Sequence, residues 1–206
     1  MALDRTHVIT TALRLLDEDG LDKLTLRRLA TELDVRAPAL YWHFEHKRAL
    51  LDHLADRILT PVLPRIEGPG RAEDWPGWLA NTATVLRTAL LGHVDGPRLA
   101  LGAHLGRARA LGLFVERTVA VLHDAGFTLT EASRAGGSFI WFVVGRTVEE
   151  QALPELTPEL LAFTAENFPT LSRAMTERTG ETQDDAFAYS VGIFISGLEA
   201  RAPKPG

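Results

Sequence analysis

The stretch from Leu24 to Phe44 constrains this chain more than any other, because it has the pattern of two short helices joined by a tight turn. Apolar residues recur at one-turn spacing between Leu26 and Leu33 and form a single stripe. Thr25 can cap this first helix by accepting a backbone N–H that would otherwise be unpaired. Pro38 suits the first turn of the second helix, where no N–H partner is needed. The pattern is typical of a helix-turn-helix, whose second helix can enter the DNA major groove.

The second helix of this stretch is expected to present aromatic rings outward. Leu40 and Phe44 lie one turn apart and point inward, which leaves Tyr41 and Trp42 on the outer side. The alternative is an ordinary helical hairpin whose aromatic residues are buried against a neighbouring helix. Local positive charge argues against that alternative, because a basic patch on a chain of formal charge −5 is typical of a phosphate-contacting surface. The basic residues are Arg27, Arg28, Arg36, Lys47 and Arg48.

Composition restricts the class of protein without identifying it. With 206 residues, 46% of them hydrophobic and 24% charged, the chain is typical of a globular protein of one or two domains. The lack of cysteine excludes disulfides and thiolate metal sites. The N-terminal residues lack the apolar run of a signal peptide, and the longest apolar run, residues 139–144, is too short to span a bilayer. We therefore expect a cytoplasmic protein with no membrane partner.

Helical periodicity continues through the rest of the chain, and no segment alternates as a strand does, so the expected fold class is all-α. We expect a DNA-binding head of three helices, which includes the helix-turn-helix, with its connecting helix over residues 1–62. A larger helical part follows over 63–202, after turn-rich residues 65–73, and a loose tail over 203–206. Outside the helix-turn-helix, helices are expected over residues 4–19, 46–60, 75–91, 104–125, 128–151 and 158–178, and from 182 onward.

Two of the expected helices are unusually apolar. Between Ala135 and Gly145 the residues are apolar or small on every side, so this helix must be buried all round. In the last helix, apolar residues from Phe187 to Leu198 form a wide stripe beside glycines and serines that permit close helix approach. A monomer could bury both helices, or they could pair with their copies in a second chain as a four-helix bundle. A homodimer would also double the short stretch of DNA that one recognition helix reads.

The segment from Leu40 to Asp52, with the sequence LYWHFEHKRALLD, resembles the signature of the tetracycline repressor (TetR) family. Weaker but ordered matches continue at Trp75, at residues 87–96 and at residues 197–199, so the resemblance covers nearly the whole chain. It implies an all-helical homodimer that binds palindromic operator DNA. It also implies that a small molecule entering the larger, ligand-binding and dimerisation part releases the DNA.

The resemblance also implies which residues contact DNA. By their chemistry, Arg27 and Lys47 suit phosphates, while Tyr41 and Trp42 suit sugar edges and thymine methyl groups. Alanines stand where tetracycline repressors carry polar base-reading side chains, and alanine can make only apolar contact with a thymine methyl. Arg36 is the best candidate for bidentate recognition of guanine, with a phosphate contact as the alternative. The expected DNA-contacting residues are Thr25, Arg27, Arg28, Arg36, Ala37, Pro38, Ala39, Tyr41, Trp42, His43 and Lys47.

On the ligand side the chain departs from the tetracycline repressors, which hold a drug–magnesium chelate. The magnesium-binding imidazole aligns with Ala100, and Glu149 alone is a poor site for a divalent ion, so we expect neither magnesium nor tetracycline and no other cofactor. An apolar cavity for a hydrophobic or aromatic effector is expected instead, although any single one of these residues, taken alone, is more typical of a plain core. The expected lining residues are Leu63, Thr82, Leu86, Ala100, Ala103, Leu113, Phe114, Thr118, Phe139, Trp141, Phe142 and Glu149.

The sequence carries no pattern of an enzyme. A glycine-rich phosphate loop, a nucleophile elbow and His-x-x-x-His spacing are all missing. The expected function is therefore a ligand-responsive transcriptional regulator, most simply a repressor. The competing hypothesis is a ligand-independent dimeric DNA-binding module whose release is controlled by a protein partner.

Overall fold

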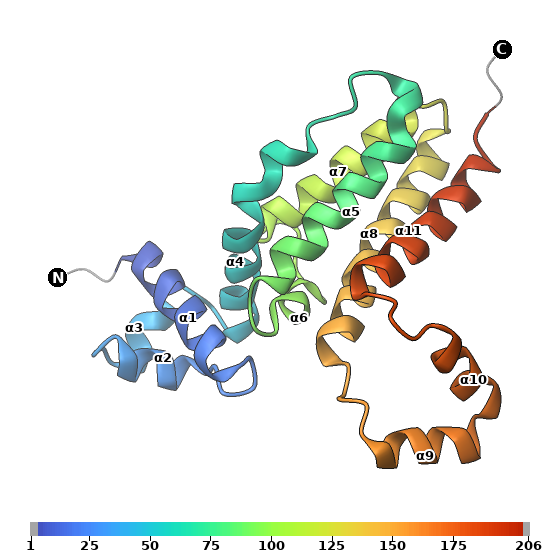
Figure 1. The fold of residues 1–206 in the computed structure, drawn as a ribbon. Coiled ribbons are helices and arrows are strands. Elements are labelled where there is room, and N and C mark those ends of the chain that lie inside the picture. Colours follow the sequence, from blue (N-terminus) through green and yellow to red (C-terminus); the bar gives the residue numbers. More distant parts are fainter. Residues whose placement is uncertain (1–3, 204–206) are drawn as a thin grey trace.

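The computed structural model describes residues 4–203, which fold into helices and connecting turns without any strand (Figure 1). The expected all-α class is confirmed. Within the described residues, no helix is both long and apolar enough to cross a membrane. The α-helices are α1 (Arg5–Asp19), α2 (Leu26–Glu32), α3 (Ala37–Tyr41), α4 (Lys47–Leu59), α5 (Trp75–Leu91), α6 (Gly96–Ala100), α7 (Arg109–Asp124), α8 (Leu129–Ala152), α9 (Pro158–Asn167), α10 (Pro169–Glu177) and α11 (Gln183–Glu199), with 3₁₀-helices η1 (Thr60–Ile66) and η2 (Ala72–Asp74).

The head consists of α1, α2 and α3, and capping residues determine where α1 ends and where α2 begins. Helix α1 ends at Gly20, whose φ of 79° is a left-handed conformation that glycine adopts without strain. Thr25 caps α2, because its hydroxyl accepts the backbone N–H of Arg28 at 3.1 Å. Leu40 of α3 and Phe44 after it are almost fully buried in the core, α3 packs against α2, and the expected helix-turn-helix is present.

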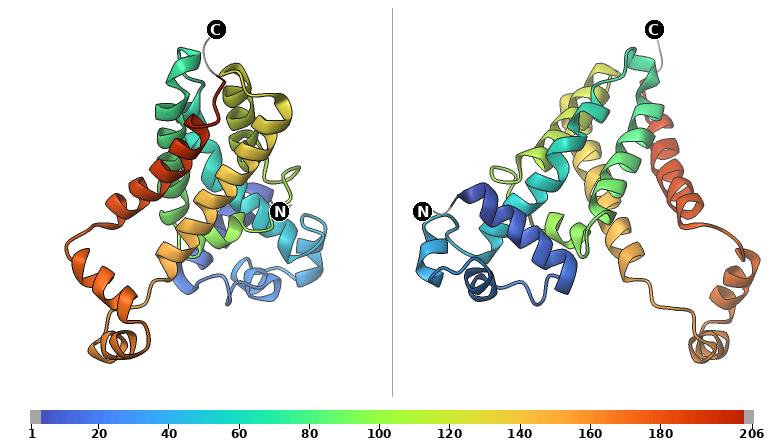
Figure 2. Two further views of the ribbon diagram at one scale, coloured as in Figure 1. Left: turned by 90° about the vertical axis from the view of Figure 1, so that its right-hand side faces the viewer. Right: turned by 60° about the vertical axis from the view of Figure 1, so that its left-hand side comes forward.

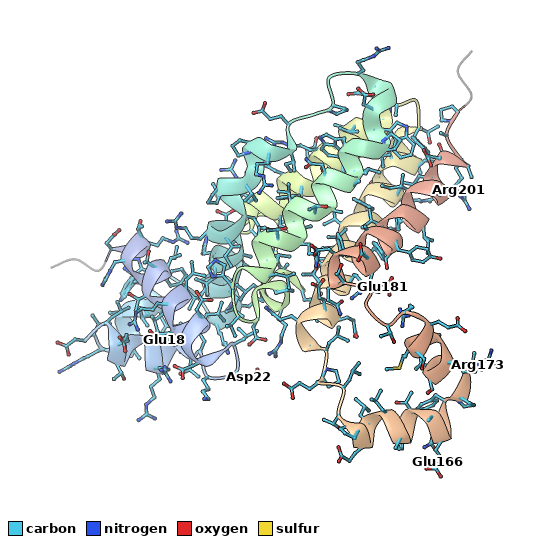
Figure 3. The ribbon with its side chains drawn as sticks, viewed as in Figure 1. Glu18, Asp22, Glu166, Arg173, Glu181 and Arg201 are labelled. Carbon is cyan, nitrogen blue, oxygen red and sulfur yellow. The ribbon has the colours of Figure 1, made fainter. Side chains whose placement is uncertain are left out.

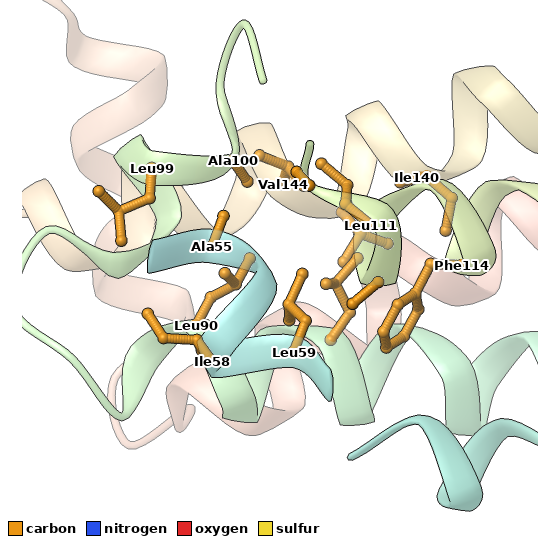
Figure 4. Packing of buried hydrophobic residues seen from close by; sticks show 14 of the residues in the cluster. Ala55, Ile58, Leu59, Leu90, Leu99, Ala100, Leu111, Phe114, Ile140 and Val144 are labelled. Carbon is orange, nitrogen blue, oxygen red and sulfur yellow. The ribbon is translucent and has the colours of Figure 1, made fainter. Parts of the chain in front are cut away.

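Helix α4 connects the head to the body, in which α5, α7, α8 and α11 run side by side (Figures 1 and 2). Apolar residues of α4 pack into the centre of the body and meet residues of α5, α6, α7 and α8 there (Figure 4). Leu59 of α4, Phe114 of α7 and Ile140 of α8 are completely buried in this cluster. One apolar core therefore includes the helix that carries the head, so a displacement of α4 must be accommodated by the body.

The structure corrects several expected helix bounds. The chain does not leave helical conformation at Pro61 but continues as the 3₁₀-helix η1 to Ile66. The segment 104–108 precedes α7 instead of belonging to it, and the short helix α6 was not expected because glycine and proline open it. The expected single helix over 158–178 is two helices. Pro169 has no N–H to continue α9, and Phe168 before it takes φ −136° and ψ 62°.

Helices α9 and α10 form a limb that stands away from the bundle, joined to it through the end of α8 and the start of α11 (Figures 1 and 2). Glu166 and Arg173 lie on the limb, whereas Glu18 and Asp22 lie on the head, where Asp22 forms an ion pair with Arg98 of α6 (Figure 3). The expected tail at 203–206 lies outside the described residues except for Pro203.

Candidate nucleic-acid interface and ligand pocket

The outer surface of α3 is apolar and open. Trp42 is 90% exposed and Tyr41 is 55% exposed, although both are large aromatic residues. Pro38 is exposed, and Ala37 and Ala39 beside it are half-buried. No neighbouring helix of the chain covers the two rings, so the alternative of a plain helical hairpin with buried aromatics is wrong. Such a pair of rings on a short outward helix is the surface that a DNA groove can cover.

Some of the basic residues around α3 are engaged within the chain. Arg28 forms an ion pair with Asp19 at the end of α1. The Lys47 ammonium donates to the carbonyl oxygen of Leu21 at 3.1 Å, which leaves it two further N–H donors. Arg48 faces the body, where it contributes to a different cluster, so the expectation that it adds to a basic outer patch is wrong.

Arg27 and Arg36 remain exposed, and neither forms an ion pair with any residue in the part of the chain that the structure describes. Arg36 occupies the N-cap of α3 with an extended backbone, and its side chain makes no capping hydrogen bond. Its guanidinium is therefore available at the start of the outward helix. Thr25, the N-cap of α2, is exposed, and His43, which follows α3, is half-buried.

A buried carboxylate ties α4 to the body. Asp52 is completely buried and accepts hydrogen bonds from Arg48 Nε and Arg107 Nε, both at 2.8 Å, and from the backbone N–H of His104 at 3.3 Å. Burial by itself would raise the pKa of Asp52, but the two guanidinium groups and the N–H hold that pKa below its usual value. Arg48 also donates to the Leu101 carbonyl oxygen at 3.0 Å, so the position of α4 is fixed against the α6–α7 connection.

A second polar contact joins the head to the turn after α5. Asp95, held in a left-handed conformation with φ 55°, accepts the backbone N–H of Leu21 at 2.8 Å. Nδ1 of His93 lies 3.0 Å from the carboxylate of Asp17 in α1. The His93 carbonyl oxygen accepts from Gln151 of α8 at 2.9 Å. The head and the end of α8 therefore both form hydrogen bonds with the turn after α5.

These contacts could not be predicted from the sequence, because their partners lie far apart in the chain. Asp52 and Arg107 are separated by 55 residues and Leu21 and Asp95 by 74. Only the glycine and proline after Asp95 were visible as a turn signal. A buried aspartate on a helix is otherwise indistinguishable from an exposed one in a single sequence.

Most of the expected ligand-binding residues come together inside the body. Leu63, Thr82, Leu86, Ala100, Ala103, Phe114, Thr118, Phe139 and Phe142 are buried or half-buried there. Leu113 and Trp141 are instead 38% and 40% exposed, and Glu149 is also exposed. Glu149 lines a surface pocket of about 600 Å³ at the end of α8, together with Arg146 and Arg178. The structure thus separates these three residues from the central group.

The central group is apolar except for its threonine hydroxyls. Thr118 and Thr147 donate to the carbonyl oxygens of Phe114 and Val143, each at 2.7 Å. Thr82 is equally buried, but its hydroxyl has no hydrogen-bond partner. Among the described residues, Oγ1 of Thr82 is the buried side-chain polar atom that has no hydrogen-bond partner. A buried polar group without a partner lowers the stability of the folded state.

The residues present do not fit a magnesium chelate. Ala100 is completely buried and carries only a methyl group where the resemblance implies an imidazole, and Glu149 points elsewhere. Residues 4–203, so far as they are described, contain no group of three His, Cys, Asp or Glu side chains able to hold a metal ion. Phe139 and Phe142 pack instead against the ring of Phe194 in α11, at centroid distances of 5.2 and 5.5 Å.

Helices α8 and α11 share an outward face that is too apolar for a solvent-exposed surface. Trp141 of α8 is 40% exposed, and Tyr189 and Ile193 of α11 are 69% and 60% exposed. Gly192 and Gly197 lie on the same exposed side of α11. Within one chain, α8 is therefore not buried all round, contrary to the expectation from its sequence.

Comparisons with known proteins agree with this geometry. Residues 8–54 match the model of bacterial regulatory proteins of the tetR family, and residues 68–202 match that of the tetracyclin repressor-like C-terminal domain. The class C tetracycline repressor protein of Escherichia coli is 38% identical over 96% of this chain and 91% of its own length.

Two solved structures cover both chains almost completely. A possible TetR family transcriptional regulator from Streptomyces coelicolor A3(2) is 36% identical, with a TM-score of 0.83 over 96% of this chain and 100% of its own. A single-residue variant of TetR from Acinetobacter baumannii AYE, in complex with minocycline, is 35% identical, with a TM-score of 0.79 over 99% and 98%. The names of these relatives describe a repressor protein and a transcriptional regulator, in line with the regulatory function expected for this chain. The chain belongs to the TetR family of bacterial transcriptional regulators.

Proposed function

We propose that this protein is a ligand-responsive repressor that binds palindromic operator DNA as a homodimer and releases it when a small, largely hydrophobic or aromatic molecule enters the body. The observation that carries the DNA-binding part is the open aromatic surface of α3, with Trp42 90% exposed. Bacterial operators lie in the cytoplasm, so the proposal places the protein there.

In the proposed complex, α3 lies in the major groove with Tyr41, Trp42 and His43 against sugars and base edges. Arg27 and Lys47 bind phosphates, and Arg36 reads a guanine at the start of the helix. Thr25 and Arg28 contribute from α2, where Arg28 keeps its partner Asp19. Ala37, Pro38 and Ala39 form the closest approach to the bases.

A selection from random duplex DNA tests this part directly. Wild-type protein is expected to enrich a palindromic sequence, and Trp42→Ala is expected to bind that sequence at least 10-fold more weakly because an exposed ring loses its contact area. The melting temperature should not change, since Trp42 packs against little in the free protein. Leu129→Ala, which also removes an exposed apolar side chain but lies at the start of α8, is the matched control. Unaltered binding by Trp42→Ala would remove α3 from the interface.

The proposed dimer forms through the outward face of α8 and α11. This face combines exposed Trp141, Tyr189 and Ile193 with glycines that allow close approach, as helix bundles require. Two heads are then held at the spacing of successive major grooves, about 34–36 Å.

The proposed effector site is the central apolar group around Thr82 and Leu86. Its support is the unpaired, buried Thr82 hydroxyl and the relative that binds minocycline. The effector is not expected to be a magnesium–tetracycline chelate, because Ala100 cannot coordinate an ion. A molecule that prefers one placement of α4 would change the distance between the two heads, and a differential affinity of a few kcal/mol would suffice.

A thermal-shift screen of neutral aromatic compounds, followed by operator-release assays, tests the effector part. Compounds that raise the melting temperature are expected to release the operator. If the protein binds its operator but no stabilising compound releases it, control by a protein partner becomes the better account.

A further inference from the structure

We infer that this head reads its operator half-site mainly through the C5 methyl groups of thymines that face Ala37 and Ala39, with a single guanine read by Arg36. The inference rests on the proposed function, since it specifies the DNA that the proposed interface recognises. The outer surface of α3 is poor in hydrogen-bonding groups. None of Ala37, Pro38 and Ala39 carries a side-chain donor or acceptor.

Base pairs differ in the major groove by their donors, their acceptors and the thymine methyl. A surface made of alanine and proline cannot pair with donors or acceptors, so the methyl group is the one feature that it can distinguish. Both alanines are half-buried, and Ala37 also packs against the hydrophobic core, so Ala39 is the more open of the two. This shallow apolar surface suits a thymine methyl and would leave the polar edge of a guanine or cytosine without partners.

Arg36 is the one long polar side chain at the start of α3. It is exposed and forms no ion pair with the residues that the structure describes, so its guanidinium can take the bidentate geometry that guanine offers. One such residue reads one base pair in each half-site. The three residues that follow it, Ala37, Pro38 and Ala39, can add sequence preference only through apolar contacts.

The combined charge of the head and the connecting helix α4 increases the relative importance of the apolar contacts. Residues 4–59 contain nine lysines and arginines and ten aspartates and glutamates, so their formal charge is −1. Arg28 is neutralised by Asp19, and Arg48 by Asp52. Since few cations remain for phosphates, non-specific attraction to DNA is weak, and specific contacts must supply a larger share of the binding free energy.

Deoxyuridine substitution tests the inference with the full-length dimer and its selected operator. Uracil lacks the C5 methyl but keeps the Watson–Crick pairing of thymine. Each thymine is replaced in turn, and the dissociation constant is measured by fluorescence anisotropy. At one or two positions of the half-site, the loss of one methyl contact is expected to weaken binding about 4-fold, and about 15-fold when both half-sites are changed. Thymines elsewhere should tolerate the change.

A double-mutant cycle assigns the effect to α3. Ala39→Gly removes the protein methyl group and is expected to weaken binding to the thymine operator by a similar factor, with little further loss on the matching uracil operator. Because glycine also weakens a helix, Ala37→Gly and Ala165→Gly, the latter at an exposed position in α9, are measured with it for stability.

The outcomes separate the two proposals. Sequence-specific binding that ignores uracil at every position would overturn methyl readout while leaving the repressor proposal intact. Methyl readout would also be overturned if uracil weakened binding but Ala39→Gly and Ala37→Gly each added an independent loss. Failure to enrich any sequence at all would instead reject the proposed function.

Discussion

Asp52 illustrates how much a single side chain can contribute to positioning a functional surface. Its carboxylate is completely buried, yet it lies between two guanidinium groups and a backbone N–H that together replace the water it has lost. Removing one member of such a cluster leaves the others unpaired, and for this reason buried ion pairs are costly to break even where they add little net stability.

Asp52→Asn should lower the free energy of unfolding by about 2–3 kcal/mol, somewhat less than for a fully buried pair, because Arg48 and Arg107 are each about one-third exposed. Urea denaturation measures the change. Asp124→Asn on α7, whose carboxylate is exposed, is the control and should change stability by less than about 0.5 kcal/mol. A loss no larger than that of the control would show that the cluster does not hold α4.

The same residue predicts a pH dependence. Its pKa in the folded protein lies below the ordinary value of 3.8, so the folded state releases the proton more readily than the unfolded state. The stability that it contributes is complete above pH 3.8 and is lost as the pH falls through the lower, folded pKa. Acid should therefore destabilise Asp52→Asn less than it destabilises the wild type.

Thr82 makes a different prediction, because its hydroxyl is buried without a partner. Thr82→Val keeps the shape and removes the hydroxyl, so the free protein should be as stable as the wild type or slightly more stable. If the effector hydrogen-bonds to Thr82, the concentration that releases half of the operator should rise about 10-fold. Thr147→Val, whose hydroxyl already donates to Val143, should leave this concentration unchanged. An unaltered response of Thr82→Val would place the effector elsewhere.

Among the helical elements, α8 and α11 differ from the other long helices in the apolar surface that they leave exposed to solvent. Each buries one side in its own chain, through Phe139 and Phe194 among others, and leaves large apolar residues on the opposite side. A helix with two apolar sides needs two partners. The second partner proposed above is the same pair of helices in another copy.

Ile193→Arg should convert the protein to a monomer, because it places a charge in the middle of the proposed bundle. Analytical ultracentrifugation measures the state of assembly, and operator affinity should fall at least 100-fold, since a lone head reads only one half-site. Leu105→Arg, at an exposed site in the α6–α7 connection, is the control for adding an arginine. A variant that stays dimeric would exclude this face as the interface.

Over the molecule as a whole, the distribution of charge sets the character of DNA binding. The chain carries a formal charge of −5, and the head itself is not positive. Long-range attraction to DNA is therefore weaker than for a protein with a basic head, and association is steered less. Arg27 of α2 is exposed and Lys47 of α4 is half-buried, and these two are the cations that the proposal assigns to phosphates.

This distribution predicts a shallow salt dependence. If Arg27 and Lys47 of each head bind one phosphate apiece, the logarithm of the association constant should fall with the logarithm of salt concentration with a slope of about −4. Anisotropy titrations between 50 and 200 mM NaCl (roughly the range over which such slopes are resolved) measure it. Arg27→Ala should reduce the slope by about 2, as one contact is lost in each half-site. A wild-type slope of about −8 would mean that more cations reach the DNA, including those now paired within the head.

Local signals in the sequence were enough to predict most of the helices and the outward aromatic surface that is proposed to bind DNA. Hydrophobic periodicity, the cap at Thr25 and the inward pair Leu40 and Phe44 act within a few residues, so a single chain displays them without reference to its fold. The same local information placed Trp42 on the outer side. It failed where local signals conflict, as at Pro61, where the helix tightens instead of ending, and at Pro169, where a periodic pattern conceals a break.

The packing of distant helices determines which polar groups are buried together and which apolar residues form a common core. Asp52, Arg107 and the α6–α7 connection meet because helices more than 50 residues apart in sequence pack side by side. The same packing left Thr82 without a partner and turned Trp141 away from the central group. Burial is a property of packed surfaces, not of residue types, and so a sequence can state which side chains are able to bind but not which of them the fold leaves free to do so.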